Sequence, residues 1–248
     1  MIGNEIHKFA KELWPINRSI TGDGVRETLS KISKHLPALK IKSIPSGTNV
    51  FDWTIPKEWN VKEAYIITPG GKKICDFSKN NLHLVGYSVP FEGKVELNEL
   101  KKHLFTLPEK PNAIPYITSY YKERWGFCLT QEEFDTLENG TYKVVIKSTL
   151  FNGELNYGEL LIKGKSNKEI FLSTYICHPS MANNELSGPT VVTFLTKWIQ
   201  EIKDINYSYR IIFIPETIGS IAYLSCNYKE MKNKILAGFN VSCVGDDR

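Results

Sequence analysis

The chain has 248 residues, of which 42% are hydrophobic and 23% charged, so it has enough apolar side chains for a core and lacks the composition of a disordered protein. Lys and Arg number 31 against 27 Asp and Glu, a net charge of +4 without a long basic block, which argues against nucleic acid as the main partner. This length allows one large α/β domain or two smaller domains.

The sequence shows no segment that would cross a membrane or direct export. No apolar run approaches the roughly 18 residues of a spanning helix. Polar residues interrupt positions 1–9, where a signal peptide would need a continuous apolar stretch. The five cysteines are an odd number without Cys-x-x-Cys spacing, so we expect reduced, mostly buried thiols rather than disulfides or a thiolate zinc site. These features together predict a cytoplasmic protein.

Two helices are predicted at the start of the chain. Apolar residues recur at helical spacing over residues 2–13 and again over residues 25–36. The connection between them, residues 17–24, is polar and contains glycines, and Thr21 or Asp23 is expected to cap the second helix. Ordinary turn formation is the simpler interpretation of this connection, and a functional role is the alternative.

Residues 47–131 differ in composition from their surroundings, and we expect them to form a separate domain. Aromatic residues and prolines are dense, and short alternating runs at 63–68 and 83–89 predict strands. Residues 97–104 predict a short charged helix. The aromatic side chains are expected to fill a small β-rich core, and a binding platform is the alternative.

From residue 140 onward, strand and helix patterns alternate. Strands are expected at 142–148, 158–163, 170–176, 209–214 and 235–244, and helices at 188–202 and 220–231. This order predicts an α/β fold with a mainly parallel sheet covered by helices on both faces. Because the opening helices would pack on the same sheet, residues 1–46 and 132–248 form one predicted domain. The small β-rich α+β domain at 47–131 is then nested within it.

Polar residues that could serve a metal follow three of the predicted strands. In open α/β sheets, functional side chains gather beyond the carboxyl ends of the strands. His178 follows one strand, Glu216 the next, and Asp246 and Asp247 the last. Imidazole and carboxylate suit zinc, and a zinc-activated water needs a carboxylate to take its proton. The sequence therefore predicts a metal site in which His178 and one of the two aspartates are ligands and Glu216 is the base. Packing or capping of the histidine and solvation of the aspartates are the simpler alternatives.

Several longer motifs resemble one known family. They are Arg18-Ser19-Ile20-Thr21-Gly22, Phe51-Asp52-Trp53, the stretch 119–127, Cys177-His178-Pro179-Ser180, Asn184-Glu185-Leu186-Ser187-Gly188, and the stretch 215–220. Together they resemble the co-catalytic zinc aminopeptidases and carboxypeptidases of the bacterial leucyl aminopeptidase type. The sequence is more specifically similar to a branch of aminopeptidase-like proteins associated with surface-polysaccharide biosynthesis, in which a domain of unknown function is inserted early in the peptidase fold.

The resemblance implies roles for individual residues. His178 matches the first zinc ligand of the family, and Glu216 matches the general base. Asn184 falls where the two-zinc enzymes carry a bridging aspartate, and Thr217 falls where they carry a second carboxylate ligand. Because an amide offers one weak oxygen donor, the resemblance implies a single, weakly held zinc with His178, Asn184 and Asp246 as candidate ligands.

The family's last histidine ligand would come from a later segment, and the chain stops at Arg248, directly after a predicted strand. We therefore expect that the C-terminal part of the peptidase-like domain is missing from this sequence.

The leading hypothesis is a zinc-dependent aminopeptidase-like hydrolase that cleaves an amide or peptide bond with a zinc-activated water. Its substrate would be a small peptide or an amide-bearing sugar in polysaccharide biosynthesis. The alternative is a catalytically inactive relative that binds a glycan precursor or a partner protein, because Asn184, Thr217 and Ser242 stand where carboxylates are expected. The sequence leaves the oligomeric state open.

Overall fold

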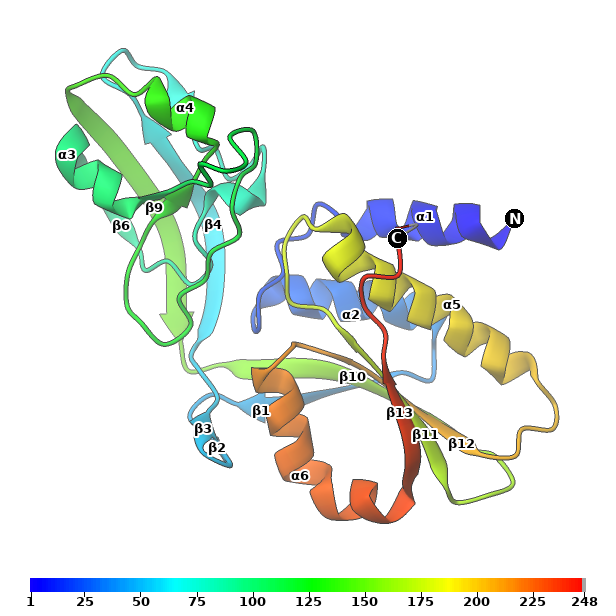
Figure 1. Ribbon diagram of the computed structural model, residues 1–248. Helices are drawn as coiled ribbons and strands as arrows, with labels where there is room; N and C mark the ends of the chain where they lie inside the picture. The colour runs from blue at the N-terminus through cyan, green and yellow to red at the C-terminus, as the bar shows by residue number, and fades with distance from the viewer. Residues whose placement is uncertain (247–248) are drawn as a thin grey trace. The chain divides into compact units, whose positions relative to one another are not determined.

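The computed structural model describes residues 1–246, and the chain divides into two compact units. Unit 1 contains residues 1–58 and the chain from Asn152 onward, and unit 2 contains Trp59–Phe151. Figure 1 labels the main elements of each unit. No helix within residues 1–246 is long and apolar enough to span a membrane.

Unit 1 is an α/β unit built on one five-stranded sheet. Its helices are α1 Ile2–Leu13, α2 Asp23–His35, α5 Ser187–Glu201 and α6 Ile218–Lys234. The strands of the sheet are β1 Lys40–Pro45, β10 Glu154–Ile162, β11 Glu169–Tyr175, β12 Ser208–Ile214 and β13 Ile235–Asn240. A π-helical turn, η3, covers Ala182–Leu186 and leads into α5. Two short strands, β2 Asn49–Val50 and β3 Trp53–Thr54, form a separate antiparallel pair.

The sheet of unit 1 is mixed rather than mainly parallel. Its strand order is β1-β10-β12-β11-β13. Strand β10 runs antiparallel to both of its neighbours, whereas β11 runs parallel to β12 and β13. The expectation failed at β10 because only residues 163–168 join it to β11, and two parallel strands need a crossover of about a dozen residues. Helices cover both faces of the sheet, with α1, α2 and α5 on one face and α6 on the other (Figure 1).

The core of unit 1 lies between the sheet and helices α1, α2 and α5. Apolar side chains at helical spacing supply the helical side, including Phe9, Leu13, Val25, Leu29 and Ile32, all of which are buried. Helix α1 has the predicted bounds, and α2, α5 and α6 begin one or two residues before the predicted positions. The expected side-chain cap on α2 is not formed within the described residues, because the residue at its N-cap is Gly22.

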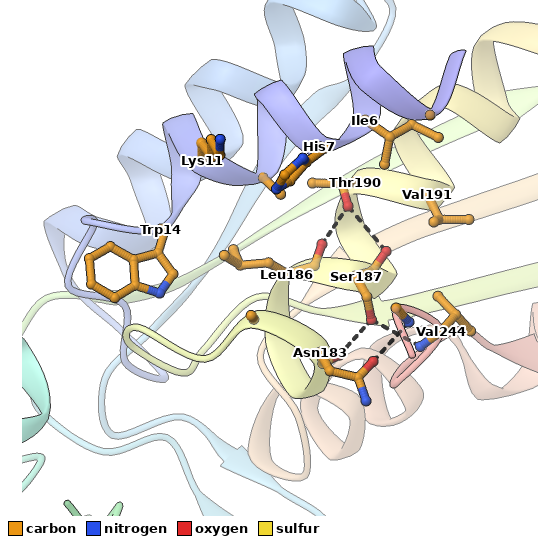
Figure 2. A pocket seen from close by; sticks show the side chains of 14 residues that line it. Ile6, His7, Lys11, Trp14, Asn183, Leu186, Ser187, Thr190, Val191 and Val244 are labelled. Carbon is orange, nitrogen blue, oxygen red and sulfur yellow. Dashed lines mark hydrogen bonds between the residues drawn. The ribbon is translucent and has the colours of Figure 1, made fainter. Parts of the chain in front are cut away.

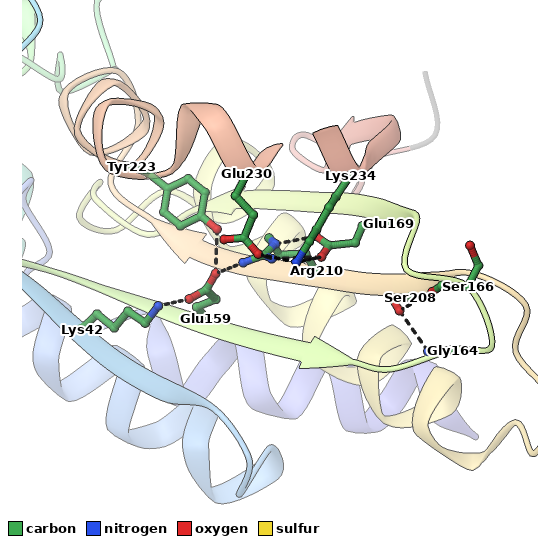
Figure 3. Close-up of polar contacts among 10 residues, drawn as sticks. All are labelled: Lys42, Glu159, Gly164, Ser166, Glu169, Ser208, Arg210, Tyr223, Glu230 and Lys234. Carbon is green, nitrogen blue, oxygen red and sulfur yellow. Dashed lines mark hydrogen bonds and ion pairs between the residues drawn. The ribbon is translucent and has the colours of Figure 1, made fainter. Parts of the chain in front are cut away.

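Helix α6 is attached to its face of the sheet through charged side chains. Arg210 of β12 donates to Glu169 of β11 (Nε to Oε2, 2.6 Å) and to Glu159 of β10 (Nη1 to Oε1, 2.6 Å), as Figure 3 shows. Its Nη2 also donates to Glu230 of α6 at 2.9 Å, and the hydroxyl of Tyr223 of α6 donates to Glu159 at 2.7 Å. This network holds α6 against three strands at once.

Unit 2 is β-rich. Its four-stranded sheet has the order β5-β4-β9-β6 and consists of β4 Glu58–Ile67, β5 Lys73–Ile74, β6 Phe91–Glu96 and β9 Thr141–Phe151. The short strands β7 Leu104–Phe105 and β8 Phe127–Cys128 form a parallel pair. The remaining elements are the helices α3 Leu97–Leu100 and α4 Gln131–Asp135 and the 3-10 turns η1 Asn81–His83 and η2 Lys101–His103.

The strand expected at 142–148 lies in unit 2 and not in the α/β sheet. It is part of β9, which pairs antiparallel with β6. Alternating burial is typical of an antiparallel strand with one buried face, but the pattern does not identify the sheet to which the strand belongs. The structure divides the chain at 58–59 and at 151–152, whereas the sequence placed the limits of the aromatic-rich domain at 47 and 131.

Aromatic side chains of unit 2 stack on one another. Trp59 stacks on Tyr87 with ring centroids 5.6 Å apart. Trp125 stacks on His103 at 3.7 Å and on Phe91 at 4.4 Å. Trp59 and Tyr87 are buried in the interior of unit 2, whereas Phe91, His103 and Trp125 are half-buried.

Candidate functional site

The site is centred on His178, which lies three residues beyond the end of β11. The imidazole is buried, and both ring nitrogens have protein partners. Nδ1 lies 3.0 Å from Oδ1 of Asn184, and Nε2 lies 2.7 Å from Oε1 of Glu216. The structure therefore brings together three of the residues predicted from the sequence.

Asn184 is held by the π-helical turn that precedes α5. Its backbone carbonyl accepts a hydrogen bond from the hydroxyl of Tyr175 at 2.7 Å, which links the turn to the end of β11. Ser187 does not cap α5, because its hydroxyl donates to the carbonyl of Asn183 at 2.5 Å. Pro189 lies in the first turn of the helix, where its missing N–H leaves no bond unmade.

Glu216 lies between the end of β12 and the start of α6. Its backbone N–H donates to the buried thiol of Cys177 at 3.3 Å, and its side chain is 43% exposed. The next residue, Thr217, has a φ of +52°, a left-handed conformation that is unfavourable for a β-branched residue. The chain therefore turns sharply here, and the carboxylate of Glu216 stays at the surface while it contacts His178.

The contact between His178 and Glu216 shifts the pKa of both groups. The hydrogen bond from His178 is the main cause that lowers the pKa of Glu216, although partial burial opposes it. Burial lowers the pKa of His178, but hydrogen bonds to Glu216 and Asn184 and the charge of Glu185 outweigh it, so the net shift is upward. Glu216 is consequently an ionised carboxylate at neutral pH.

Two buried charged residues that the sequence analysis did not single out complete the surroundings of His178. Glu185 is 0% exposed, and its Oε2 lies 3.5 Å from Nδ1 of His178. Arg18 is 1% exposed, and its Nε donates to the carbonyl of His178 at 3.0 Å and lies 3.4 Å from Oε1 of Glu185. Burial raises the pKa of Glu185 to about 7, even though Arg18 and His178 both oppose the shift. Both residues belong to motifs that carried the family resemblance, which was the only signal available for them.

Asp246 lies apart from the carboxylates that contact His178. Its Oδ2 accepts a hydrogen bond from Nδ2 of Asn183 at 2.7 Å. In residues 1–246, the group of potential metal ligands that contains His178 consists of Cys177, His178 and Glu185, and it does not include Asp246. The alternative ligand, Asp247, lies outside the described residues.

The residues around His178 do not fit a zinc ion. Catalytic zinc sites need three protein ligands on one side of an open position, but Asn184 and Glu216 contact opposite nitrogens of the ring. Cys177 and Glu185 have ligand atoms within 4.8 Å of His178. However, the guanidinium of Arg18 already faces that carboxylate, and a second cation there would be repelled.

A cavity of about 360 Å³ opens beside Glu216. It is lined by Ser173, Tyr175, Ile214, Glu216, Thr217, Ser220 and Asn240, so six of its seven side chains are polar. Within residues 1–246, the side chains of Ser173, Ser220 and Asn240 make no hydrogen bond to another protein group. Their donors and acceptors are therefore available to a ligand.

A second cavity, of about 480 Å³, lies between α1 and the start of α5 (Figure 2). Its lining includes Ile6, Trp14, Leu186 and Val191, and it does not contain His178 or Glu216. The cavity beside Glu216 is therefore the one that belongs to the site.

The fold of the chain is similar to the folds of solved aminopeptidases and related peptidases. The chain aligns over 98% of its length with a zinc aminopeptidase from Bacillus subtilis, at a TM-score of 0.66 and 11% identity and over 69% of that chain. It aligns over 95% of its length with an M28 peptidase precursor from Shewanella amazonensis, at a TM-score of 0.58 and 9% identity and over 73% of that chain. At these identities the similarity establishes the fold alone.

The chain belongs to the family described as domain of unknown function DUF4910, whose model matches residues 7–248. It is 53% identical over 244 residues to a protein of Clostridium acetobutylicum named for polysaccharide biosynthesis and for an aminopeptidase-like domain, with 98% of this chain and 56% of that protein covered. A crystal structure from the same organism, of a protein named as a peptidase, matches with a TM-score of 0.95 and 52% identity over 98% of this chain and 57% of that one. The resemblance inferred from the motifs is thus confirmed. The chain spans little more than half the length of these two relatives.

Proposed function

We propose that this chain is part of an aminopeptidase-like hydrolase that cleaves an amide or peptide bond, with Glu216 as the group that takes a proton from the attacking water. The observation that carries the proposal is the pairing of Glu216 with the buried His178 at 2.7 Å, on the wall of a polar cavity. A positioned carboxylate at the entrance of a cavity is the arrangement required for general-base catalysis.

The pair of Glu216 and His178 suits this role because Glu216 can accept the proton and His178 holds the carboxylate in position. The lowered pKa keeps Glu216 ionised and able to accept a proton, and its partial exposure lets a water reach it. His178 holds one carboxylate oxygen through Nε2, which leaves the second oxygen free to face the cavity. A positioned base of this kind accelerates a reaction by about 10²- to 10⁴-fold.

Whether the protein holds zinc has to be measured, and no step of the proposed reaction depends on it. The sequence predicted one zinc, and the similar structures include a zinc aminopeptidase from Bacillus subtilis. Because the residues around His178 do not fit a zinc ion, the proposal assigns no part of the reaction to a metal. Metal analysis of the full-length protein after purification without chelators decides whether zinc is present.

The polar lining of the cavity supports an amide-bearing sugar over an apolar peptide side chain as the substrate. Hydroxyl groups of a sugar would satisfy the available groups of Ser173, Ser220 and Asn240, whereas an apolar group would leave them without partners. The association of the Clostridium acetobutylicum relative with polysaccharide biosynthesis points in the same direction.

The experiment is to compare the wild type with Glu216→Gln in the full-length protein on N-acetylated amino sugars and small peptides. Glu216→Gln should lower kcat by about 10²-fold or more in a protein that remains folded. Glu201→Gln, at the exposed end of α5, is the matched control and should keep full activity. Full turnover by Glu216→Gln would refute the proposal.

A second candidate function is ligand binding without catalysis. It is favoured by Asn184 and Thr217, which stand where related enzymes are expected to carry carboxylates, and by the engagement of both nitrogens of His178. Binding of an amino sugar without turnover of any amide, and with the same affinity in Glu216→Gln, would support this candidate.

A further inference from the structure

Arg18 is the bulkiest fully buried side chain among residues 1–246, and it contacts the site from a distant part of the sequence. It lies in the connection between α1 and α2. Its Nη1 donates to the carbonyl of Leu13 at 2.6 Å, and its Nε donates to the carbonyl of His178 at 3.0 Å. One guanidinium therefore ties the end of α1 to the backbone that carries the central histidine.

Glu185 lies between Arg18 and the ring of His178. Its Oε1 is 3.4 Å from Nε of Arg18, and its Oε2 is 3.5 Å from Nδ1 of His178. The side chains of Arg18 and Glu185 are both 0% exposed, so water screens neither contact. On the far side of the ring, Nε2 of His178 contacts Glu216. The four side chains thus form a continuous series from the buried cation to the surface carboxylate.

We propose that Arg18 and Glu185 are positioning residues, which fix the ring of His178 so that its Nε2 addresses Glu216. Acceptors lie at both ring nitrogens, Asn184 and Glu185 at Nδ1 and Glu216 at Nε2, so they orient the ring and favour the doubly protonated imidazolium, whose Nε2–H donates to Glu216. Arg18 keeps Glu185 in place and also fixes the backbone at His178. The inference rests on the proposed function only in treating Glu216 as the group that His178 serves.

Stability alone does not account for this pair. Nη2 of Arg18 and both carboxylate oxygens of Glu185 are buried without a hydrogen-bond partner among the described residues. Burying charges with incomplete hydrogen bonding is costly, and well-packed apolar residues of similar volume are often as stable or more stable. Arg18 and Glu185 are costly for stability and lie against His178. Their role in orienting the ring of His178 explains the pair better than a contribution to stability does.

The test is an NMR measurement of the imidazole N–H resonances of His178 in full-length protein labelled with ¹⁵N-histidine. The resonance is assigned by its loss in His178→Gln. In the wild type, the proton on Nε2 should exchange slowly with water because it is held against Glu216. Arg18→Met should abolish this resonance through fast exchange, and Arg18→Lys, which keeps a cation, should restore it.

Arg26→Met is the matched control. Arg26 is also partly buried and pairs with Glu58 and Asp23, both at 2.5 Å, but it makes no contact with the site residues described above. Arg26→Met should lower the thermal stability of the protein and leave the His178 resonance unchanged. An unchanged resonance in folded Arg18→Met would overturn the inference.

Glu185→Gln keeps the test decisive if Arg18→Met does not fold, because it preserves side-chain volume. It should also abolish the slowly exchanging resonance, and a wild-type resonance in this variant would overturn the inference. The measurement does not require turnover. If no amide is cleaved but the resonance depends on Arg18 and Glu185, the proposed function fails and the positioning role stands.

Discussion

At the scale of single residues, the site consists of His178 with oxygen atoms at both ring nitrogens. Asn184 and Glu185 lie at Nδ1, and Glu216 lies at Nε2. His178 and Glu216 could be predicted from the sequence because each follows a strand that ends at the same edge of the sheet. The contributions of Arg18 and Glu185 could not, because Arg18 lies 160 residues before His178 and its contacts depend on how the opening connection folds back. A contact between residues so far apart in the sequence cannot be predicted from the pattern of neighbouring residues.

The buried carboxyl of Glu185 predicts how stability depends on pH. Its folded-state pKa of about 7 lies above the ordinary value of 4.5, so the folded state binds the proton more tightly than the unfolded state. The resulting stabilisation is complete below about pH 4.5 and is lost as the pH rises towards 7. The raised pKa of His178 acts in the same direction at higher pH, because its stabilisation is present below 6.5 and is lost as the pH rises through its folded-state pKa.

The free energy of unfolding should therefore fall by about 2–3 kcal/mol between roughly pH 5 and pH 8. Glu185→Gln should remove most of this slope, whereas Glu201→Gln should keep it. Urea denaturation at a series of pH values measures both. An equal slope in Glu185→Gln and in the wild type would show that Glu185 does not carry the dependence.

At the scale of elements, the helices were predictable and the pairing of the strands was not. The 3.6-residue periodicity located α1, α2, α5 and α6, because each helix buries one face whatever lies opposite it. Strand β9 was found but assigned to the wrong sheet, and β10 was given the wrong direction. The two errors differ in origin. Alternating burial defines β9 as a strand but does not specify its neighbour, whereas β10 is joined to β11 by a connection too short for the two strands to run parallel.

Gly188 lets helix α5 approach Val241 and Thr174 closely. A Cβ at this position would overlap the backbone carbonyl of Val241 and the hydroxyl of Thr174. Gly188→Ala should therefore destabilise the protein by about 1–3 kcal/mol, although alanine ordinarily favours a helix. Gly3→Ala in α1 is the matched control, because no atom lies within 4 Å of its Cβ position, and it should be neutral or slightly stabilising. Equal effects of the two substitutions on the urea midpoint would contradict the close approach at Gly188.

The network around Arg210 makes a second prediction at this scale. Arg210→Met would remove the guanidinium shared by the buried Glu159 and Glu169, and Glu159 would keep only its pair with Lys42. The expected loss is about 3–5 kcal/mol, the usual cost of breaking a buried ion pair from one side. Lys165→Met removes an exposed pair with Asp204 and should have little effect on the denaturation midpoint. A loss from Arg210→Met no larger than that from Lys165→Met would show that α6 does not depend on this network.

At the scale of the whole molecule, the chain forms two units with separate interiors. The aromatic composition indicated a second domain, but its limits differ from those of unit 2, because residues 47–58 belong to unit 1 and β9 lies beyond residue 131. Each unit has its own sheet and its own buried apolar residues. Substitutions in one interior are therefore expected to act on that unit first.

Matched substitutions can test this separation. Ile211 of unit 1 and Ile66 of unit 2 are both 0% exposed, so replacement of either by alanine should cost about 2–5 kcal/mol. Ile211→Ala should lower the calorimetric transition of unit 1, and Ile66→Ala should lower that of unit 2 and leave the other in place. A single transition that shifts equally in both variants would show that the two units unfold together.

The contact between Arg18 and His178 has a consequence for synthesis of the protein. Because 160 residues separate the two, this loop cannot close before the chain as far as His178 has left the ribosome. Until then, Arg18 has no buried carboxylate to face and remains hydrated. The site is therefore assembled late in folding, after helices α1 and α2 have formed from local contacts.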